Sequence, residues 1–325
     1  MTQNSVPLLE VKDLAVSFRT DEGTTPVLHG LSYTLPKGKI LAVVGESGSG
    51  KTVHALSLLR LLPPTARIEK GQILFNGQNI CRMENKKLRE LRGAKIAMIF
   101  QDPAASLNPV LTIGEQLTET IQAHKKVTPQ EARNEAVKLL QEVGIREAEK
   151  RLNEYPFQFS GGMCQRVMIA MALALHPEVL IADEPTTALD VTIQAQILKL
   201  IRDLQRKNNM SAVFITHNLA VVAGIADEVL VLYGGLCMEQ APVEDLFATP
   251  LHPYTQGLLK SLVSVQRKME KLPAIEGQPP VPGQIKKGCP FAPRCEKATE
   301  KCFETCPSLF EKGTRKVRCW LEENV

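Results

Sequence analysis

A glycine-rich segment near the start of the chain has the residue types that bind phosphate. It lies between an apolar stretch, KILAVV, and a helical one, and it fits the pattern G-x4-G-K-[ST]. Glycines let the backbone wrap around phosphate oxygens, and a lysine and a hydroxyl then serve the β- and γ-phosphates and Mg²⁺. An ordinary glycine turn is the alternative, but every fixed position of the pattern is filled. The sequence therefore predicts a nucleotide site at Gly45, Glu46, Ser47, Gly48, Ser49, Gly50, Lys51 and Thr52.

Two carboxylates, Asp183 and Glu184, end a second apolar run, VLIA. At the carboxyl edge of a buried strand beside a phosphate loop, Asp183 would hold Mg²⁺ through its hydration shell. Glu184 would then polarise the attacking water. A solvated strand end is the alternative, and the apolar run together with the phosphate loop argues against it.

Gln101 and His217 also end predicted strands, IAMIF and SAVFIT. Parallel sheets place their ligands at the carboxyl ends of their strands, so both side chains are expected at the same edge as the phosphate loop. A lone histidine is more often structural. The functional interpretation of His217 therefore depends on its place at a strand end and in the order of the motifs.

A second possible anion site is the helix start formed by Ser160, Gly161 and Gly162. Backbone N–H groups and the helix dipole favour anions at such a position. One γ-phosphate does not need two cradles from the same chain, so this one is predicted to reach the nucleotide of a partner subunit. Most Ser-Gly-Gly triplets lie in loops, and the triplet alone is a weak signal.

Five of the eight cysteines are clustered near the end of the chain. In a reducing compartment such a cluster more often binds metal than forms disulfides. Thiolates suit both iron–sulfur clusters and zinc, but the spacing lacks the CxxC pairs of zinc ribbons. An unstructured tail with incidental cysteines is disfavoured by the interleaved proline, phenylalanine and arginine. The clustered residues are Cys289, Cys295, Cys302, Cys306 and Cys319.

Strand-like and helical segments alternate along most of the chain, which predicts an α/β fold with a mostly parallel sheet covered on both faces. The main domain is expected over residues 8–263, with a helical subdomain at about 102–175. A Pro/Gly-rich linker follows over 264–288, and a small Cys-rich module occupies 289–325.

Composition excludes several classes of protein. The 325 residues have a formal net charge of only +4, spread along the chain, which gives no case for a nucleic-acid partner. No apolar run approaches the roughly 20 residues of a spanning helix. The first residues lack the basic start and apolar run of a signal peptide. We therefore expect a protein in the cytosol or one that touches a membrane only from the side.

The order of these motifs resembles that of ABC-transporter ATPases, over residues 8 to about 240. The motifs are GESGSGKT, Gln101, FSGGM, VLIADEPTTALD and His217. Three longer stretches, QDPAASLNPVLTIGEQ, HPYTQGLLKSL and GQPP before CPFAPRC, are similar to the peptide and nickel branch. The resemblance implies a P-loop ABC cassette with a mostly parallel core sheet, an antiparallel β subdomain and a helical subdomain.

The resemblance also implies roles for the matching residues. Phe18 would stack on adenine, Gln101 would sense the γ-phosphate through Mg²⁺, and His217 would stabilise the transition state. Ser160 and Gly162 would close on the partner's ATP, and Asp190 would cross the dimer interface. The signature differs from Leu-Ser-Gly-Gly-Gln because it reads FSGGM, and Cys164 replaces a commonly basic residue. The remaining roles fall to residues already described: ATP binding to Gly45–Thr52, metal binding to Asp183 and base catalysis to Glu184.

The branch also implies cofactors and partners. ATP and Mg²⁺ would be joined by a [4Fe–4S] cluster on Cys289, Cys295, Cys302 and Cys319, with Cys306 as a substitute for Cys319 or a spectator. The expected partners are a second ABC ATPase, a heterodimer being favoured over a homodimer, two permease subunits and an extracytoplasmic solute-binding protein. The subunit would lie at the cytoplasmic face of the cell membrane.

The expected function is ATP hydrolysis that energises the import of di- or oligopeptides. Three alternatives remain open from the sequence. They are the same role in a nickel or metallophore importer, a nucleotide-gated iron–sulfur sensor, and a non-transport ABC ATPase. The last usually has a coiled-coil insertion or two cassettes, and neither feature is in the sequence.

Overall fold

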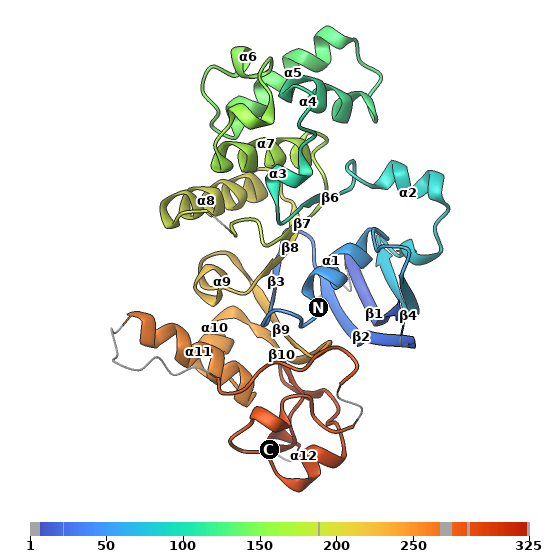
Figure 1. Cartoon of the computed structure of the whole chain (residues 1–325), viewed down its shortest axis with the longest axis vertical. Helices are drawn as coiled ribbons and strands as arrows, with labels where there is room; N and C mark the ends of the chain where they lie inside the picture. Colours follow the sequence, from blue (N-terminus) through green and yellow to red (C-terminus); the bar gives the residue numbers. More distant parts are fainter. Residues whose placement is uncertain (1–6, 22, 188, 267–274, 285–286, 324–325) are drawn as a thin grey trace, which may run out of the picture. The chain divides into compact units, whose positions relative to one another are not determined.

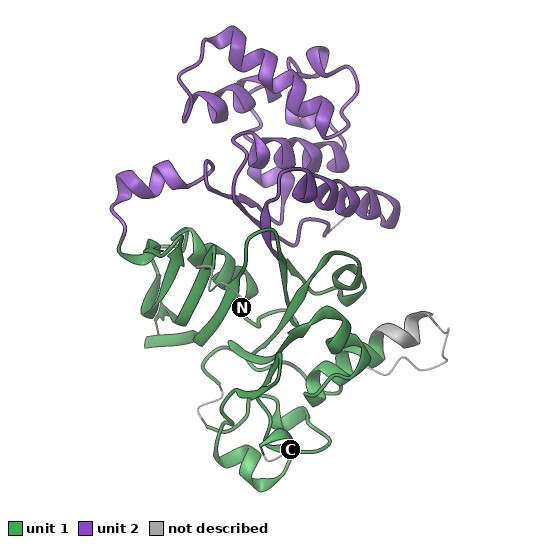
Figure 2. Ribbon diagram, turned by 180° about the vertical axis from the view of Figure 1, so that it is seen from behind, with its two compact units in different colours: residues 1–82, 214–325 green, residues 83–213 purple. Residues whose placement is uncertain are grey.

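The computed structural model describes the chain except residues 1–6, 22, 188, 267–274, 285–286 and 324–325. The chain divides into two compact units, shown in different colours in Figure 2. Unit 1 consists of Met1–Arg82 and Phe214–Val325, and unit 2 of Met83–Val213. The division falls within strand β8 (Ser211–Thr216).

Unit 1 contains a four-stranded antiparallel sheet of order β2-β1-β4-β5. The long strand β1 pairs on one side with β2 and on the other with β4, so that Leu9 faces Leu35 and Phe75. Alternate side chains of β1 are fully buried, as expected of a strand with one face on a core. The strands are β1 (Leu9–Thr20), β2 (Gly23–Leu35), β4 (Ala66–Phe75) and β5 (Gln78–Asn79).

The second sheet of unit 1 includes the strand that leads into the phosphate loop. Strand β3 (Ile40–Val44) is buried at all five positions and pairs in parallel with β9 (Glu228–Tyr233). Strand β10 (Leu236–Pro242) returns antiparallel along β9 after a turn of two glycines. Two short strands near the C-terminus, β11 (Phe310–Lys312) and β12 (Arg315–Val317), continue this sheet from β10. The Cys-rich segment is thereby paired to the same sheet as β3.

The helices of unit 1 are short apart from the one that precedes the linker (Figure 1). They comprise α-helices and single 3₁₀ turns: α1 (Lys51–Leu58), α9 (Leu219–Ile225), α10 (Val243–Ala248), α11 (Pro253–Gln266), α12 (Glu300–Glu304), η1 (Ile80–Arg82), η3 (Ala292–Arg294) and η4 (Trp320–Glu322).

The Cys-rich module packs against the sheet through aromatic rings. Phe291, only 3% exposed, contacts Tyr233 edge-on at a centroid distance of 5.4 Å and Tyr254 at 5.3 Å. The His252 ring lies 5.8 Å from the same phenylalanine. Phe291, Tyr233 and Tyr254 belong to one hydrophobic cluster with residues of strands β3, β9 and β10. Aromatic contacts of this kind bury a large apolar area, so they hold the module to the sheet.

Unit 2 is mainly helical. Its two strands, β6 (Ile96–Ile99) and β7 (Val179–Asp183), are parallel, and every side chain of both is buried. Thr112 and Thr128 each begin a helix with a capping box that includes the glutamate three residues later. Its helices are α2 (Asn85–Leu91), α3 (Pro103–Ser106), α4 (Ile113–Gln122), α5 (Pro129–Glu142), α6 (Ala148–Arg151), η2 (Pro156–Gln158), α7 (Gly161–Leu173) and α8 (Val191–Lys207).

Part of the predicted linker can be placed. Residues 267–274 and 285–286 of the 264–288 segment lie outside the described residues. The described part is docked on unit 1, because the carbonyls of Ile275 and Glu276 accept hydrogen bonds from Arg294. Gly283 also approaches the Thr25 side chain in β2.

The buried histidine of α1 gives unit 1 a predicted pH dependence. His54 is fully buried next to the Tyr33 hydroxyl, 2.7 Å from its Nε2, and burial lowers the pKa of the imidazole to about 4. Between pH 6.5 and 4 the unfolded chain binds a proton here that the folded chain does not. The His54 contribution to the free energy of unfolding is thus fully present above pH 6.5 and falls, by on the order of 3 kcal/mol, toward pH 4.

A His54→Gln variant is expected to lose that part of the acid sensitivity, because glutamine does not titrate. The measurement is the urea midpoint of unfolding at pH 7 and at pH 4.5, compared with wild type. His124→Gln, at an exposed histidine, is the matched control and should keep the wild-type difference. An equal pH dependence in wild type and His54→Gln would contradict the assignment.

Candidate functional site

The phosphate loop connects β3 to α1 in unit 1, as the sequence predicts. Gly48 and Gly50 have φ angles of 78° and 101°, values that favour glycine over residues with a Cβ. Gly50 is the N-cap of α1 and has no side chain to cap the helix. The first turn of the helix therefore directs its N–H groups toward the loop, where an anion is stabilised.

Gly45 is required for a steric reason. A Cβ at this position would lie 2.1 Å from the carbonyl oxygen of Leu232 and 2.8 Å from the Ser49 hydroxyl. The Ser49 Oγ is buried and has no hydrogen-bond partner among the described residues. A buried polar atom without a partner is costly, and a phosphate oxygen in the loop would satisfy it. The loop thus fits a phosphate ligand by its shape and by its chemistry.

Lys51 is folded back over the loop. Its side chain is almost fully buried, and Nζ donates to the carbonyls of Gly45, at 2.9 Å, and Glu46, at 3.0 Å. This arrangement holds a positive charge at the mouth of the cradle. Thr52 is exposed one residue further along α1, where its hydroxyl is accessible to a metal ion.

Two further predicted residues lie in unit 1 outside the loop. Phe18 is half-buried in β1, where it pairs with Thr25 of β2 and with Ala66 of β4. His217 directly follows β8 and is exposed. The exposure of Phe18 and His217 and their positions in unit 1 are both compatible with the predicted contacts to ATP.

The acidic pair and Gln101 come together within unit 2. Gln101 follows β6, and its Nε2 lies 3.4 Å from Glu184 Oε2. Asp183 ends β7 and is 2% exposed, whereas Glu184 is partly exposed. The backbone of Glu184 has φ 46°, a left-handed conformation that is rare for a residue with a Cβ. Such strain is typical of functional positions, where the surrounding structure holds the side chain in a required direction.

Sequence reasoning missed Thr187. Its hydroxyl donates to Glu184 Oε2 at 2.9 Å and fixes the direction of the carboxylate together with Gln101. The available signal was its position in DEPTTALD, three residues after the glutamate.

The Ser-Gly-Gly triplet begins the 13-residue helix α7, as predicted. Ser160 is the N-cap, and its hydroxyl accepts the Met163 N–H at 3.4 Å. Gly161 is exposed, and a Cβ at Gly162 would lie 2.9 Å from Ile193 of α8. Asp190 is the exposed N-cap of α8, where its carboxylate accepts the Ile193 N–H. The starts of α7 and α8 are therefore packed together within unit 2.

Four of the clustered cysteines line one small pocket in unit 1, and Cys306 is absent from its lining. Burial raises the pKa of the Cys289 thiol to about 12 and also raises the pKa values of Cys295 and Cys319. In the described part of the chain no three His, Cys, Asp or Glu side chains form a group that could hold a metal ion. The four lining cysteines are Cys289, Cys295, Cys302 and Cys319.

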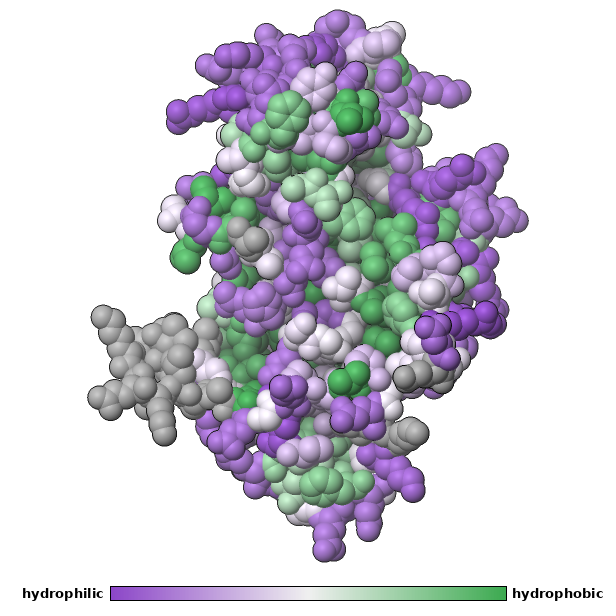
Figure 3. All heavy atoms as spheres, in the orientation of Figure 1, coloured by the Kyte–Doolittle hydropathy of each residue, from purple (hydrophilic) through white to green (hydrophobic). Residues whose placement is uncertain are grey.

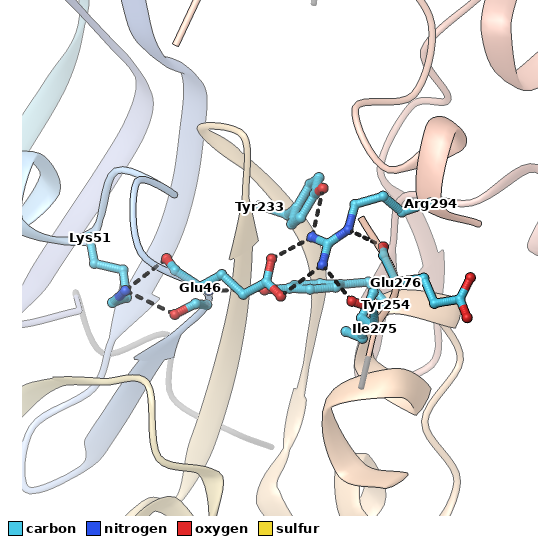
Figure 4. A network of polar contacts seen from close by, with 8 residues as sticks. Glu46, Lys51, Tyr233, Tyr254, Ile275, Glu276 and Arg294 are labelled. Carbon is cyan, nitrogen blue, oxygen red and sulfur yellow. Dashed lines mark hydrogen bonds and ion pairs between the residues drawn. The ribbon is translucent and has the colours of Figure 1, made fainter. Parts of the chain in front are cut away.

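A side chain from the Cys-rich module reaches the phosphate loop, which the sequence did not reveal. The Arg294 guanidinium binds the Glu46 carboxylate through two hydrogen bonds, of 2.5 and 3.1 Å (Figure 4). Arg294 belongs to the quoted CPFAPRC motif, but its partner lies 248 residues earlier. The Glu46 side chain is thus directed to the module rather than to the phosphate position.

Comparison with known proteins assigns the chain to a class. The ABC transporter family profile matches residues 28–187, and the profile of the oligopeptide/dipeptide transporter C-terminal region matches 238–302. A dimeric ATP-binding cassette solved in a post-hydrolysis state with ADP and phosphate has a TM-score of 0.65 and 25% identity. The similarity covers 72% of this chain and 98% of that one. The chain is therefore an ABC-transporter ATP-binding protein, and the predicted α/β cassette fold is confirmed.

Full-length relatives define the branch. The chain is 49% identical to the oligopeptide transport ATP-binding protein OppD of Bacillus subtilis, over 97% of this chain and 88% of that protein. It is 48% identical to the dipeptide transport ATP-binding protein DppD of the same organism, over 97% and 95%. The chain belongs to the oligopeptide and dipeptide transport ATP-binding proteins.

The space at Gly45 yields a prediction. Gly45→Ala should abolish measurable ATP binding, because the new Cβ can be accommodated only if the loop moves away from the Leu232 carbonyl. Gly77→Ala is the matched control, since Gly77 also has a positive φ, 78°, but has open space around its Cβ position and lies outside the loop. It should cost about 1 kcal/mol of stability and leave the affinity unchanged. Titration with a fluorescent ATP analogue measures the affinity of both variants. Wild-type affinity in Gly45→Ala would refute the steric argument.

Proposed function

We infer that this chain is the ATP-hydrolysing subunit of an importer for oligopeptides or dipeptides. The observation that carries the inference is the 48–49% identity, over nearly the whole chain, to ATP-binding proteins named for oligopeptide and dipeptide transport. The names and the matching C-terminal profile favour peptides over nickel or a metallophore as the solute. They also favour transport over a sensor or a non-transport ATPase.

The residues of each unit have distinct parts in the proposed reaction. In unit 1 the loop from Gly45 to Thr52 would bind the triphosphate, Phe18 would stack on the adenine and His217 would stabilise the transition state. In unit 2 Asp183 would bind Mg²⁺ with Gln101, and Glu184 would polarise the attacking water. The hydrogen bonds from Gln101 and Thr187 support this role, because they orient the Glu184 carboxylate.

A second ATP-binding subunit would complete each site. Ser160, Gly161 and Gly162 of one cassette would contact the ATP of the other, and Asp190 would lie at the interface. The exposed, capped start of α7 and the dimeric ATP-binding cassette among the similar structures support this arrangement. We propose a heterodimer with a related ATPase in preference to a homodimer.

Two permease subunits and an extracytoplasmic solute-binding protein would complete the importer. Unit 2 exposes large apolar side chains next to Gln101 in the sequence and shortly before Ser160, and Figure 3 shows hydrophobic residues among the hydrophilic ones on the surface that it displays. Exposed apolar surface favours docking to another protein. No described helix is long and apolar enough to cross a bilayer. We propose peripheral attachment at the cytoplasmic face through a surface that includes Phe100, Val110, Tyr155 and Phe157.

Glu184→Gln should separate ATP binding from hydrolysis in the assembled transporter. Glutamine keeps the size of the side chain and its contacts with Gln101 and Thr187, but it is a far weaker base. ATP affinity should remain within about twofold of wild type, and the turnover number should fall by roughly two to four decades. Phosphate release at saturating ATP measures the effect. Near-wild-type turnover would remove Glu184 from the role of base.

We also propose that the four pocket cysteines bind a [4Fe–4S] cluster. Four thiolates are the ligand set that such a cluster requires, and each binds a different iron, so the sulfurs need not converge on one metal ion. The shared pocket of Cys289, Cys295, Cys302 and Cys319 supports the proposal. Burial raises the thiol pKa values of Cys289, Cys295 and Cys319, so binding of a metal ion there would have to displace their protons. When bound, the cluster would cross-link the module.

The lining of the pocket favours Cys319 over Cys306 as the proposed fourth ligand. Protein prepared without oxygen should contain iron and sulfide in near-equal amounts and be brown. Cys319→Ser should lose most of the iron, and Cys306→Ser, the matched control, should retain it. Stoichiometric zinc without iron would overturn the cluster, and iron loss in Cys306→Ser alone would overturn the choice of ligand.

A further inference from the structure

The strongest polar link between distant parts of unit 1 joins the Cys-rich module to the phosphate loop. Arg294 donates four hydrogen bonds besides the shorter one to Glu46, and Figure 4 shows the guanidinium at the centre of this network. They go to the second Glu46 oxygen at 3.1 Å, the Tyr233 hydroxyl at 3.1 Å, and the carbonyls of Glu276 at 2.9 Å and Ile275 at 3.1 Å. The three guanidinium nitrogens of Arg294 thus all donate to defined acceptors.

The Arg294 side of the ion pair is buried, whereas the Glu46 side is partly exposed. The Arg294 side chain is 6% exposed and that of Glu46 is 26% exposed. A buried arginine–carboxylate pair with two parallel hydrogen bonds fixes both position and direction. Removal of one partner leaves the other as an uncompensated charge in a poorly solvated place, which costs far more than loss of an exposed pair.

Glu46 itself is the second residue of the phosphate loop. Its carbonyl accepts from Lys51 Nζ, and its N–H donates to the Tyr254 hydroxyl at 2.9 Å. Tyr254 packs on Phe291, which lies three residues before Arg294. The backbone and the side chain of Glu46 are therefore both held by the C-terminal part of unit 1.

A second point of approach lies at Gly48, two residues further along the loop. Gly48 lines a small pocket together with Pro280, Pro282 and Pro290. The proline-rich segment before the cysteines therefore lies close to Gly48, which has a positive φ angle in the phosphate loop. The module contacts or borders the phosphate loop at two separate positions.

The ion pair should affect ATP binding through the charge of Glu46. An unpaired Glu46 carboxylate would place a negative charge within the loop that has to accept a triphosphate, and like charges repel over these distances. Arg294 neutralises that charge and holds the carboxylate away from the phosphate position.

We propose that Arg294 is a positioning residue for ATP binding, through which the folded Cys-rich module controls the affinity of the phosphate loop. The proposal rests on ATP binding by the loop, but it requires only the folded module and not the iron–sulfur cluster. Because coupling between two sites is reciprocal, ATP binding should also stabilise the module.

The test is a set of variants of the full chain, with Mg-ATP affinity measured by equilibrium titration. Arg294→Met should raise the dissociation constant on the order of tenfold, because it leaves the Glu46 charge unneutralised. Arg294→Lys keeps the charge without the fork and should raise it only about two- to threefold. Arg315→Met is the control, since Arg315 lies in the same module and binds the Thr249 carbonyl instead. It should leave the affinity unchanged.

The double variant Glu46→Gln with Arg294→Met separates this role from mere support of the fold. Neutralising both partners should recover most of the affinity lost in Arg294→Met. A purely structural role predicts that the double variant binds as weakly as Arg294→Met or more weakly, which would overturn the proposal. Should Arg294→Met not accumulate as folded protein, Arg294→Gln with and without Glu46→Gln provides the same comparison, because glutamine also removes the positive charge.

Hydrogen exchange tests the reverse direction. In wild type, saturating ATP should slow amide exchange in residues 289–319 severalfold, and Arg294→Lys should reduce that protection. Wild-type ATP affinity in Arg294→Met, or absence of ATP-dependent protection in the module of wild type, would overturn the proposal. Failure of the wild-type chain to bind ATP would instead refute the proposed function.

Discussion

The space around Gly45 is the constraint on which the rest of the site depends. The Leu232 carbonyl at the end of β9 occupies the volume that any side chain at position 45 would need. The next turn adds to this contact, because the Gly235 N–H donates to the Ser49 carbonyl and the Gly235 carbonyl accepts from His29. The loop therefore takes its form from the β9–β10 turn and from β2 as much as from its own glycines. Since these contacts come from the protein itself, phosphate binding need not supply all of the energy that orders the loop.

The C-terminal module is part of the same framework. Strands β12 and β11 extend the sheet that contains β3 and β9, and Phe291 packs on the two tyrosines beside the loop. Arg294 then reaches Glu46 from this base. An iron–sulfur cluster in the proposed pocket would lie next to Arg294 in the chain, at Cys295. The stability of the module and the geometry of the nucleotide site would then be linked through one short segment.

Motifs that are local in sequence could be predicted, and long-range contacts could not. The phosphate loop, the acidic pair and the start of α7 each consist of consecutive residues whose chemistry is evident without a partner. Helix α1 shows the limit of periodicity, since the sequence predicts a helical stretch after the phosphate loop, whereas the helix already begins within it, at Lys51. Its first turn consists of phosphate-binding residues, which follow no apolar pattern.

The choice among the cysteines has the same explanation. Their spacing indicated a set of five, and the family resemblance already favoured Cys289, Cys295, Cys302 and Cys319. Neither showed that the β11–β12 hairpin returns Cys319 to the pocket of Cys289, while Cys306 lies outside its lining. The Arg294–Glu46 pair spans 248 residues, and nothing in either local sequence identifies the other as its partner. Thr187 was missed for a different reason, because a threonine in the turn after a strand is common and acquires meaning only through its hydrogen bond to Glu184.

The central claim is that contacts from the C-terminal part of unit 1 hold the phosphate loop in the shape that binds phosphate. An experimental structure of the full chain with a bound ATP analogue and Mg²⁺ tests it most directly. The account predicts phosphate oxygens within hydrogen-bond distance of the loop N–H groups and of Ser49, with the Arg294–Glu46 pair intact. A triphosphate bound elsewhere, or a loop rearranged with that ion pair broken, would contradict it.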